Sequence, residues 1–387
     1  MRHLLLKTPS ILTCIIIMVA SCKAMGQPSS EVLLSATENA YNPIPNPDAT
    51  LIAYVRTGWG RPGGTGGFGR SNLVSEIMLV TASGEVVSRK PLADAFLYGW
   101  SRDGKYIISF RDGKYSIVSP EGNAVRSGRL PQWSDYYDVS ERIAFLANTN
   151  LVLWVQNDYT NIKRVATSPS SEYMTRDFVR SVLQSPEGEV ARFSSELHAD
   201  EMLVPSPNER YLALVRTAPR GESEHLWVYD RQNKSWADLG EIIIHPDEAW
   251  DYINPAWDPW FADSSRVTYL SAMGVVISSP NGKTKRIVSR PKGAAGLVAP
   301  SPDGEYIAYA TFESRPMKQR PDLKFWGGST IWVIPVAPNS MARPVTRKDR
   351  DTTYSLHWLG GHQLVFDRVA DEMFYGKARL WKVDVPR

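Results

Sequence analysis

The sequence predicts an all-β fold, a seven-bladed β-propeller of four-stranded antiparallel blades, and three observations carry this prediction. A turn followed by alternating apolar residues recurs seven times in the 387 residues, about once per 50 residues, which is a repeat length typical of propellers. Further turns rich in Gly, Pro, Asn and Asp divide each repeat into short strand-like runs. Finally, each end of the chain carries one strand-like segment that has no partner in its own repeat.

The clearest copy of the repeat is Ser301-Pro302-Asp303-Gly304-Glu305-Tyr306-Ile307-Ala308-Tyr309. Pro presets the backbone angle of the turn, Asp bonds back to the main chain, and Gly accepts a positive φ. The residues that follow alternate with period two, as in a half-buried strand. The six weaker copies begin at Pro47, Arg102, Val139, Pro207, Ala262 and Leu359. The copy at Val139 places Ile143-Ala144-Phe145 in the second strand of blade 3.

The start of the chain predicts export. A basic beginning is followed by an apolar core (11–20) that is too short to span a bilayer, as in a secretory signal. Val19-Ala20-Ser21-Cys22 resembles the lipobox of bacterial lipoproteins, which predicts lipidation of Cys22; ordinary cleavage after Gly26 is the alternative. We therefore expect a secreted protein, periplasmic or anchored to the outer membrane by its N-terminal lipid only. The expected division is a signal peptide (1–22), a linker (23–29) and one propeller domain (30–387).

Composition narrows the function classes. Cys14 and Cys22 are the only cysteines, so the folded part has no disulfide or thiol chemistry. The formal net charge of +3 does not indicate nucleic acid or an acidic substrate, and a secreted protein has little access to nucleic acid. Thirteen Trp, 17 Tyr and 11 Phe are explained by aromatic packing between blades.

Individual blades can be divided further. Blade 2 is expected to place its strands at 97–101, 106–110, 114–119 and 124–127. In blade 5, Gly274 separates the second and third strands and Pro280-Asn281-Gly282 the third and fourth. Thr330-Ile331-Trp332-Val333-Ile334 and Leu226-Trp227-Val228-Tyr229-Asp230 are expected third strands in blades 6 and 4.

The two chain ends predict how the ring closes. Arg379-Leu380-Trp381-Lys382-Val383 reads as a third strand with nothing after it, and Glu31-Val32-Leu33-Leu34 precedes blade 1 without a partner. Free strand edges would expose unpaired backbone groups and favour aggregation. We predict that the N-terminal segment supplies the outer strand of blade 7.

The repeated Ser-Pro-Asp-Gly-x-Tyr-Ile-Ala-Tyr phrase, its spacing and the leader resemble the TolB-like, WD-repeat-related β-propeller lipoproteins of bacteria. The resemblance covers roughly residues 30–387 and implies the fold; it says little about function, because propellers host many activities. TolB itself has six blades and a separate N-terminal domain, which the sequence lacks, so the resemblance does not imply a role in the Tol system. Prolyl-oligopeptidase-type enzymes share the repeat, but their Gly-x-Ser-x-Gly elbow is absent here.

The loops between the second and third strands (b–c loops) of blades 1, 6 and 7 are long, and these blades are neighbours once the ring closes. Binding residues commonly lie on loops held by a rigid scaffold. The candidate residues are Trp59, Arg61, Phe68 and Arg70 in blade 1, Arg315, Lys318, Arg320, Lys324 and Trp326 in blade 6, and Phe374 and Tyr375 in blade 7. Together they predict a surface for an anionic or aromatic group on a peptide, glycan or small ligand. The alternative is solvated loops whose aromatic residues pack over the blade ends.

A short amphipathic helix is expected on the same face, between blades 3 and 4. Its prediction rests on the helical spacing of Met174, Phe178, Val182 and Leu183.

Motifs for metal and nucleotide chemistry are weak. The six histidines include no i, i+4 pair and no metal-spaced cluster. The glycines of the blade 1 loop lack the spacing of a nucleotide-binding loop. His245-Pro246-Asp247-Glu248 with Asp251 offers ligands for a hard cation, but an exposed acidic turn is the simpler interpretation. We predict no metal and no cofactor.

Motifs for catalysis are equally weak. Ser194 and Ser195 lie near His198 in sequence, but proximity alone does not identify a triad. Asp258-Pro259-Trp260-Phe261 is interpreted as packing in an enlarged turn between the first and second strands of blade 5.

Two functional hypotheses remain. The first is a non-enzymatic cell-envelope scaffold that binds a protein, peptide or other ligand through its loop-rich face. The alternative is a propeller lyase or hydrolase that acts on saccharides or peptides at the channel mouth. Such enzymes gather histidines or carboxylates on inner strands, and His357 is the only histidine expected on one. We therefore predict no catalytic residues.

Overall fold

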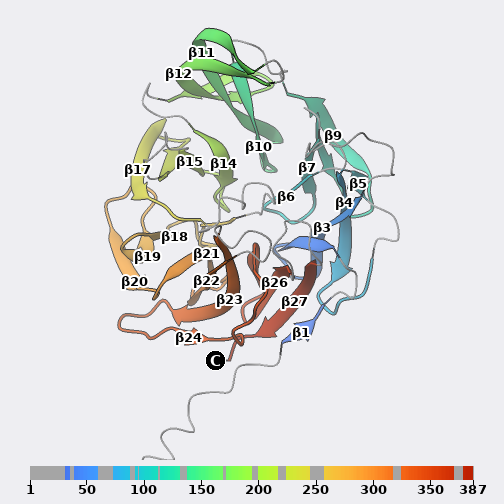
Figure 1. Cartoon of the computed structure of the whole chain (residues 1–387), viewed down its shortest axis with the longest axis vertical. Helices are drawn as coiled ribbons and strands as arrows, with labels where there is room; N and C mark the ends of the chain where they lie inside the picture. The colour runs from blue at the N-terminus through green and yellow to red at the C-terminus, as the bar shows by residue number, and fades with distance from the viewer. Residues whose placement is uncertain are drawn as a thin grey trace, which may run out of the picture.

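The computed structural model describes residues 31–34, 39–59, 73–87, 92–94, 96–111, 114–130, 137–168, 171–193, 199–216, 224–244, 257–316, 324–369 and 378–386. Within these ranges the chain forms strands and turns and no helix. The strands make seven antiparallel sheets arranged as a ring around a central axis (Figure 1). The predicted seven-bladed, all-β propeller is confirmed.

The blades are numbered in chain order, and strands a to d run from the inside of the ring to the outside. Blade 1 contains β2 (Ala40–Pro45), β3 (Leu51–Trp59), β4 (Leu73–Thr81) and β5 (Ala93–Asp94), and blade 2 contains β6 (Phe96–Trp100), β7 (Ile107–Arg111), β8 (Lys114–Val118) and β9 (Ala124–Arg129). Blade 3 contains β10 (Tyr137–Leu146), β11 (Leu151–Ser168), β12 (Ser171–Ser185) and β13 (Gly188–Arg192). Blade 4 contains β14 (Ala199–Pro205), β15 (Tyr211–Arg216), β16 (His225–Asp230) and β17 (Ser235–Glu241).

The remaining blades follow the same order. Blade 5 contains β18 (Val267–Ser271), β19 (Gly274–Ser278) and β20 (Lys285–Ser289), and blade 6 contains β21 (Ala294–Pro300), β22 (Tyr306–Pro316), β23 (Lys324–Pro335) and β24 (Arg343–Pro344). Blade 7 contains β25 (Leu356–Leu359), β26 (Gln363–Val369) and β27 (Ala378–Asp384), with β1 (Val32–Leu33) at its outer edge.

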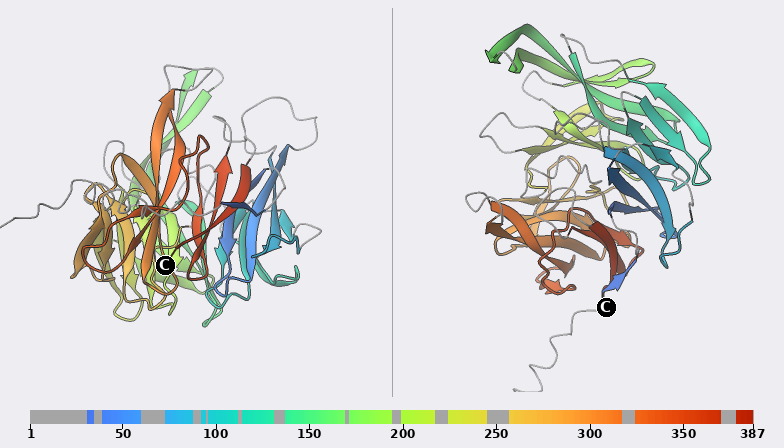
Figure 2. Two further views of the ribbon diagram at one scale, coloured as in Figure 1. Left: turned by 90° about the horizontal axis from the view of Figure 1, so that it is seen from below. Right: turned by 45° about the vertical axis from the view of Figure 1, so that its right-hand side comes forward.

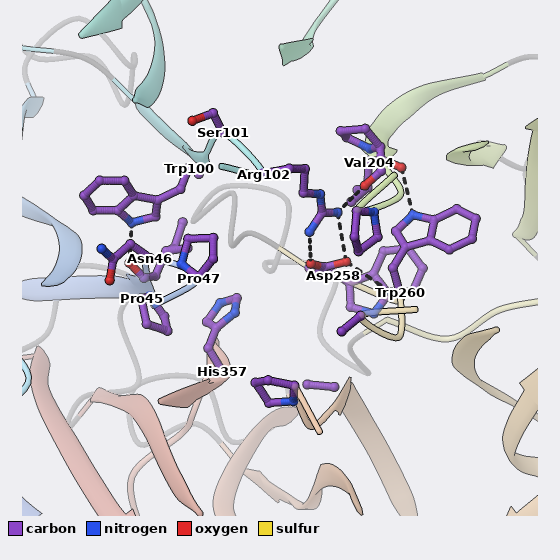
Figure 3. Close-up of a pocket in the computed structure, with 18 of the residues that line it drawn as sticks. Pro45, Asn46, Pro47, Trp100, Ser101, Arg102, Val204, Asp258, Trp260 and His357 are labelled. Carbon is purple, nitrogen blue, oxygen red and sulfur yellow. Dashed lines mark hydrogen bonds and ion pairs between the residues drawn. The ribbon is translucent and has the colours of Figure 1, made fainter. Parts of the chain in front are cut away.

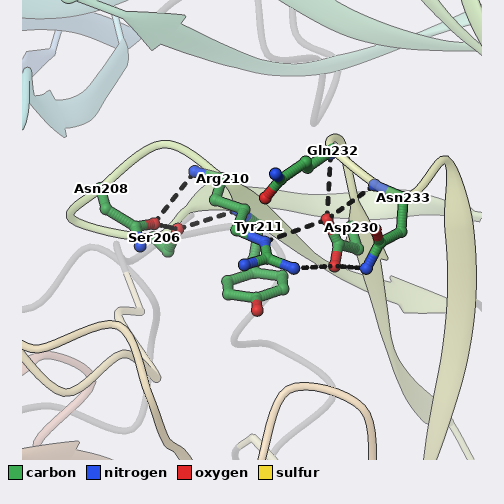
Figure 4. A network of polar contacts seen from close by, with 7 residues as sticks. All are labelled: Ser206, Asn208, Arg210, Tyr211, Asp230, Gln232 and Asn233. Carbon is green, nitrogen blue, oxygen red and sulfur yellow. Dashed lines mark hydrogen bonds and ion pairs between the residues drawn. The ribbon is translucent and has the colours of Figure 1, made fainter.

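The recurring phrase forms the a–b turn, and its side chains hold the turn closed. In blade 6 the Ser301 hydroxyl oxygen accepts the Tyr306 N–H at 2.9 Å, and Asp303 accepts the Glu305 N–H at 3.0 Å. Blade 4 repeats this pattern with Ser206 and Asn208 (Figure 4). The fourth turn residue has a positive φ in six blades, as Ala49, Gly104, Asn150, Glu209, Ser264 and Gly304. The phrase is thus a local hydrogen-bonded unit that sets the register of strands a and b.

Blade 4 adds an ion pair behind its turn. The Arg210 side chain donates to Asp230 at 2.7 and 3.2 Å and lies over the Tyr211 ring at 4.8 Å (Figure 4). The Arg210 hydrogen bond, together with the N–H groups of Asn233 and Gln232, lowers the pKa of Asp230 below its ordinary value.

Blade 3 departs from the prediction. Val139–Arg142 is not its a–b turn and Ile143–Phe145 is not its second strand, because both belong to the inner strand β10. The pairing register of β10 shifts between Val139 and Ile143, so the polar residues there form an irregularity within a strand. The turn follows at residues 147–150, where Asn150 has the positive φ.

The predicted helix after blade 3 is also wrong. Met174, Phe178, Val182 and Leu183 all lie in β12, which pairs with β11 from Ser171 to Gln184. The segment is rich in aromatic and β-branched residues, which favour strands. Pairing with β11 satisfies its backbone groups, and Val182 and Leu183 are buried in the blade.

Blade 5 differs at its inner edge. The sequence interpretation placed residues 258–261 in an enlarged a–b turn, whereas they occupy the strand a position. Trp260 forms an isolated bridge with Val267, and the Thr268 N–H donates to the Pro259 carbonyl at 2.8 Å. Trp260 is packed, as expected, but Asp258 faces the central channel (Figure 3).

The N-terminal segment closes the ring from outside, as predicted. Val32 pairs with Lys382 and Leu33 with Trp381, and the Leu34 N–H donates to the Leu380 carbonyl at 2.8 Å. We call residues 31–34 the latch. The latch carboxylate of Glu31 pairs at 2.5 Å with Arg368, whose side chain is 6% exposed and also pairs with Asp349 at 2.7 Å. The latch is therefore held by backbone pairing and by a charge network between blades 6 and 7.

A buried carboxylate closes the ring from inside. Asp367 on β26 is fully buried and accepts the N–H groups of Tyr354 (2.8 Å) and Ser355 (3.0 Å) in blade 7 and of Asn42 (3.2 Å) in blade 1. The Ser355 hydroxyl and the Asn42 amide also contact each other at 3.1 Å. Burial raises the pKa of Asp367 to about 6, against the opposing effect of the three N–H donors. One side chain thus joins the first blade to the last.

Deleting residues 31–34 should lower the free energy of unfolding by about 3 kcal/mol, because it removes the buried Leu34 side chain and its backbone hydrogen bond. Denaturant unfolding of the propeller measures this loss. Deleting residues 27–30 instead is the matched control and should leave stability unchanged. Equal stability of the two deletion variants would contradict the role of the latch.

Replacing Asp367 by Asn should change the pH dependence of stability. The folded pKa of about 6 lies above the ordinary value of 3.8, so Asp367 binds its proton more tightly in the folded protein than in the unfolded chain. The stability that this proton binding contributes is fully present below pH 3.8 and is lost as the pH rises through 6. From pH 4.5 to 7.5 the wild type should lose about 2 kcal/mol relative to Asp367→Asn. Paired denaturant titrations measure the difference, and a constant difference across this range would refute the assignment.

Candidate functional site

The ring has two unlike faces. The a–b and c–d turns lie on one face, and the b–c and d–a connections lie on the other. Two b–c hairpins project far beyond the blades on the same side of the ring, from blades 3 and 6 (Figure 2). We call the face with the a–b and c–d turns the turn face and the opposite face the loop face. One end of the central channel lies at the turn face. Each face offers a different kind of site.

The inner strands are joined at the turn face by tryptophans. Trp100, Trp260 and Trp358 each lie directly before the a–b turn of blades 2, 5 and 7. Their indole N–H groups donate to main-chain carbonyls in the preceding blade, at Ile44 (2.8 Å), Val204 (3.0 Å) and Ala299 (2.9 Å) respectively. The inner strand of each blade is an edge strand, so these bonds satisfy carbonyls that the sheet leaves open.

Prolines complete this arrangement in the accepting blades. Pro45, Pro205 and Pro300 follow the three accepting carbonyls directly and end the inner strands of blades 1, 4 and 6. Proline suits an edge strand because it has no N–H to leave unpaired. We call each Trp–carbonyl contact with its proline an inner seam. Three inner seams thus join blades 1 to 2, 4 to 5 and 6 to 7.

A cavity of about 350 Å³ lies inside this ring of inner strands, and all seven blades contribute to its walls. Its described apolar lining includes Ile44, Ile143, Phe145, Leu203 and Trp257, together with the prolines and tryptophans of the inner seams. The residues come from the ends of the inner strands and from the a–b turns, so the cavity lies at the turn face. Binding cavities are commonly of this size and mainly apolar.

An ion pair crosses the channel at this cavity. The Arg102 guanidinium, from the a–b turn of blade 2, donates to Asp258 of blade 5 and to the Pro205 carbonyl of blade 4 (Figure 3). Arg102 passes blade 3 and contacts the two blades beyond it. The side chains are 19% and 40% exposed, so Asp258 is the more accessible partner. Asp258 also accepts the Trp260 N–H at 3.1 Å.

The cavity lining limits the chemistry available there. Its described ionisable side chains are Arg102, Asp258 and His357. A second carboxylate for paired acid–base chemistry is missing from this described lining. Among the described residues there is also no group of three side chains that could hold a metal ion.

The opposite face is dominated by two hairpin arms. The blade 3 arm is the outer part of β11 and β12, where pairing continues from Tyr159–Phe178 to Ser168–Ser171. The blade 6 arm is the outer part of β22 and β23, where Glu313 pairs with Gly327 and Pro316 with Lys324. From Tyr159 to Ser168 the blade 3 arm extends by about 30 Å at the usual rise of a strand. The arms lie on opposite sides of the ring (Figure 1).

The predicted loop residues are only partly described. Trp59 ends β3, Arg315 lies in β22, and Lys324 and Trp326 lie in β23, all at the ends of strands that reach the loop face. Arg315 pairs with Glu313 at 3.6 Å and is 30% exposed. Arg61, Phe68, Arg70, Lys318, Arg320, Phe374 and Tyr375 lie outside the described residues. The binding surface stays a prediction.

Several weaker motifs also lie outside the described residues: the leader with Cys22, most of the glycine-rich loop, Ser194 with Ser195 and His198, and residues 245–251. Among the described residues, no helix is long and apolar enough to cross a membrane.

Sequence reasoning missed two features. The blade 3 arm was read as a helix, although its basic and aromatic residues (Lys163, Arg164, Tyr173 and Arg176) resemble those of the blade 6 loop. The channel cavity was missed because its residues are distant in sequence. A signal was nevertheless present, since Trp or Pro directly precedes the a–b turn in six repeats.

Matches to known proteins are distant. No family model and no curated protein matches the chain. Solved structures that match include a putative TolB from Agrobacterium tumefaciens (TM-score 0.37, 11% identity, 76% of this chain and 92% of that chain). A dipeptidyl peptidase 4 from Porphyromonas gingivalis matches with a TM-score of 0.47 and 9% identity over 83% of this chain and 48% of that chain. A eukaryotic initiation factor matches with a TM-score of 0.45 and 13% identity over 95% of this chain and 91% of that chain. At such identities these similarities concern the propeller fold alone.

Proposed function

We propose that the protein is a non-catalytic binding scaffold of the bacterial cell envelope, which holds a protein or peptide partner on its loop face. The observation that carries this proposal is the pair of hairpin arms on one side of the ring (Figure 2). Strand pairing, interrupted by register shifts, continues in the arms from Tyr159 to Ser168 and from Glu313 to Pro316. Arms of this length that project from the ring (Figure 2) are well explained by contact with another molecule.

The size and chemistry of the arms favour a macromolecule. The arms stand on opposite sides of the ring, in blades 3 and 6, so a partner that touches both must cover the channel mouth. Both arms carry basic and aromatic residues in their sequences, among them Lys163, Arg164, Arg315 and Lys324. Arginine and aromatic residues are enriched in protein interfaces. We infer a partner that presents acidic groups between the arms.

The leader supports the location. The basic start, the short apolar core and Cys22 are those of an exported bacterial lipoprotein. The latch begins nine residues after Cys22, so a lipid on that cysteine would tether the propeller near a membrane surface. No cysteine follows Cys22, which suits a domain that folds without disulfides after export.

The alternative, an enzyme with a site at the channel mouth, finds less support. It requires clustered carboxylates or histidines, whereas the described lining of the channel cavity has one carboxylate that is paired with Arg102. A binding scaffold needs no such cluster.

Shortening the arms should abolish partner binding. Residues 159–179 can be replaced by Asn-Gly, because Asp158 and Arg180 are a paired position that a two-residue hairpin loop can join. Residues 314–326 can be replaced in the same way between the paired Glu313 and Gly327. In pull-downs from envelope extracts, each variant should recover the wild-type partner at least about tenfold less, a loss of about 1.4 kcal/mol.

Two further variants define the surface. Replacing Arg61, Arg70, Arg320 and Lys324 together by Ala should weaken recovery as well. The control replaces Lys105, Lys234 and Lys283, three exposed lysines in turns on the opposite face, and should leave recovery unchanged. Undiminished recovery by both shortened variants would refute the proposal.

A further inference from the structure

We propose that the channel cavity at the turn face is a second binding site, for a small neutral molecule with an apolar body and one amide-like group. This site lies at the opposite end of the channel from the hairpin arms. It is therefore independent of the partner surface proposed above.

The apolar side chains that line the cavity favour a ligand with an apolar body. Residues of all seven blades line the cavity, and its volume of about 350 Å³ suits a small molecule rather than a peptide chain. Side chains such as Ile44, Phe145 and Leu203 line it together with six prolines: Pro45, Pro47, Pro205, Pro207, Pro300 and Pro302. An apolar body that fills this volume would be stabilised by its removal from water.

Most polar groups of the lining are already committed to the fold. The indole N–H groups of Trp100, Trp260 and Trp358 bind carbonyls across the inner seams. The hydroxyls of Ser101 and Ser301 are used within their own a–b turns. These groups position the walls and leave recognition to the cross-channel pair of Arg102 and Asp258.

The hydrogen-bond inventory of this pair defines the polar part of the ligand. Arg102 has five N–H donors, of which three are used, two by Asp258 and one by the Pro205 carbonyl. Asp258 has about four acceptor positions, of which three are used, two by Arg102 and one by the Trp260 N–H. The pair can thus still donate and still accept. An amide group, with its C=O and N–H, satisfies both capacities at once.

The charge of the pair excludes an ionic ligand. Arg102 and Asp258 neutralise each other, so neither a cation nor an anion would find an unpaired opposite charge between them. A charged ligand in this mainly apolar cavity would lose its hydration without full compensation. His357 also lines the cavity, so all probes are compared at one pH.

Three probes of similar size test this inference: phenylacetamide (neutral), phenylacetate (anionic) and phenethylammonium (cationic). Their affinities for the wild-type domain at pH 8 can be measured by calorimetry and by saturation-transfer NMR. Phenylacetamide should bind at least about tenfold more tightly than either charged probe. Absence of binding by all three probes would overturn the proposal.

Removing one charge of the pair should reverse the preference. Asp258→Asn leaves Arg102 unneutralised and should favour phenylacetate, while Arg102→Met leaves Asp258 unneutralised and should favour phenethylammonium. A general loss of structure would weaken all probes alike and would not produce opposite preferences. Unchanged relative affinities in folded Asp258→Asn and Arg102→Met proteins would contradict the site.

Location can be tested without disturbing the ion pair. Ala262 is an exposed turn residue on the rim of the cavity, so Ala262→Trp should block the probes while the blades stay intact. The arm-shortened variants should bind phenylacetamide as the wild type does. Equal phenylacetamide affinity in Ala262→Trp and wild type would place the probe elsewhere and refute the cavity as its site.

Discussion

The ring of a propeller closes only if its first and last blades are in contact, because the chain itself connects every other pair of neighbouring blades. Here that contact is made twice. Inside the ring, the buried carboxylate of Asp367 accepts hydrogen bonds from N–H groups of blades 7 and 1. Outside the ring, the latch pairs with β27, and its Glu31 forms an ion pair with Arg368. The inner contact costs desolvation of a charge, which is why burial raises the pKa of Asp367.

The closed ring supports a different structure at each of its two faces. Around the axis, the three inner seams join the inner edges of neighbouring blades through tryptophan and proline, and these residues line the channel cavity. Arg102 then spans the cavity to blades 4 and 5. On the other face, the same rigid frame carries the two arms. A scaffold with a fixed ring can hold these arms at a constant separation, which lowers the entropy lost when a partner binds.

Sequence-based predictions were correct where a short motif is stabilised by interactions among its own residues. The Ser-Pro-Asp-Gly phrase predicted the a–b turns because Ser301 and Asp303 bond within a few residues. The pairing of the two chain ends followed from the need to cover strand edges. Both predictions required only the pattern of turns and alternating residues.

The failures have physical causes too. Blade 3 lacks the capping serine, so Val139–Arg142 was mistaken for a turn although it interrupts a strand. In β12, apolar residues such as Met174 and Phe178 happen to fall at helical spacing, and only the long-range pairing with β11 makes them a strand. The channel cavity depends on residues 156 positions apart, as in the contact of Arg102 with Asp258. No local pattern could reveal that contact.

Hydrogen exchange at the junction of blades 7 and 1 tests the central claim, that the ring is closed there from inside. The amides of Asn42, Tyr354 and Ser355 donate to Asp367, so they should exchange only when the two blades separate and should be among the slowest in the protein. Mass spectrometry of peptides covering 40–45 and 352–357 can follow them, with the blade 3 arm (159–179) as a fast internal reference. Exchange at the junction as fast as in the arm would contradict the closed ring.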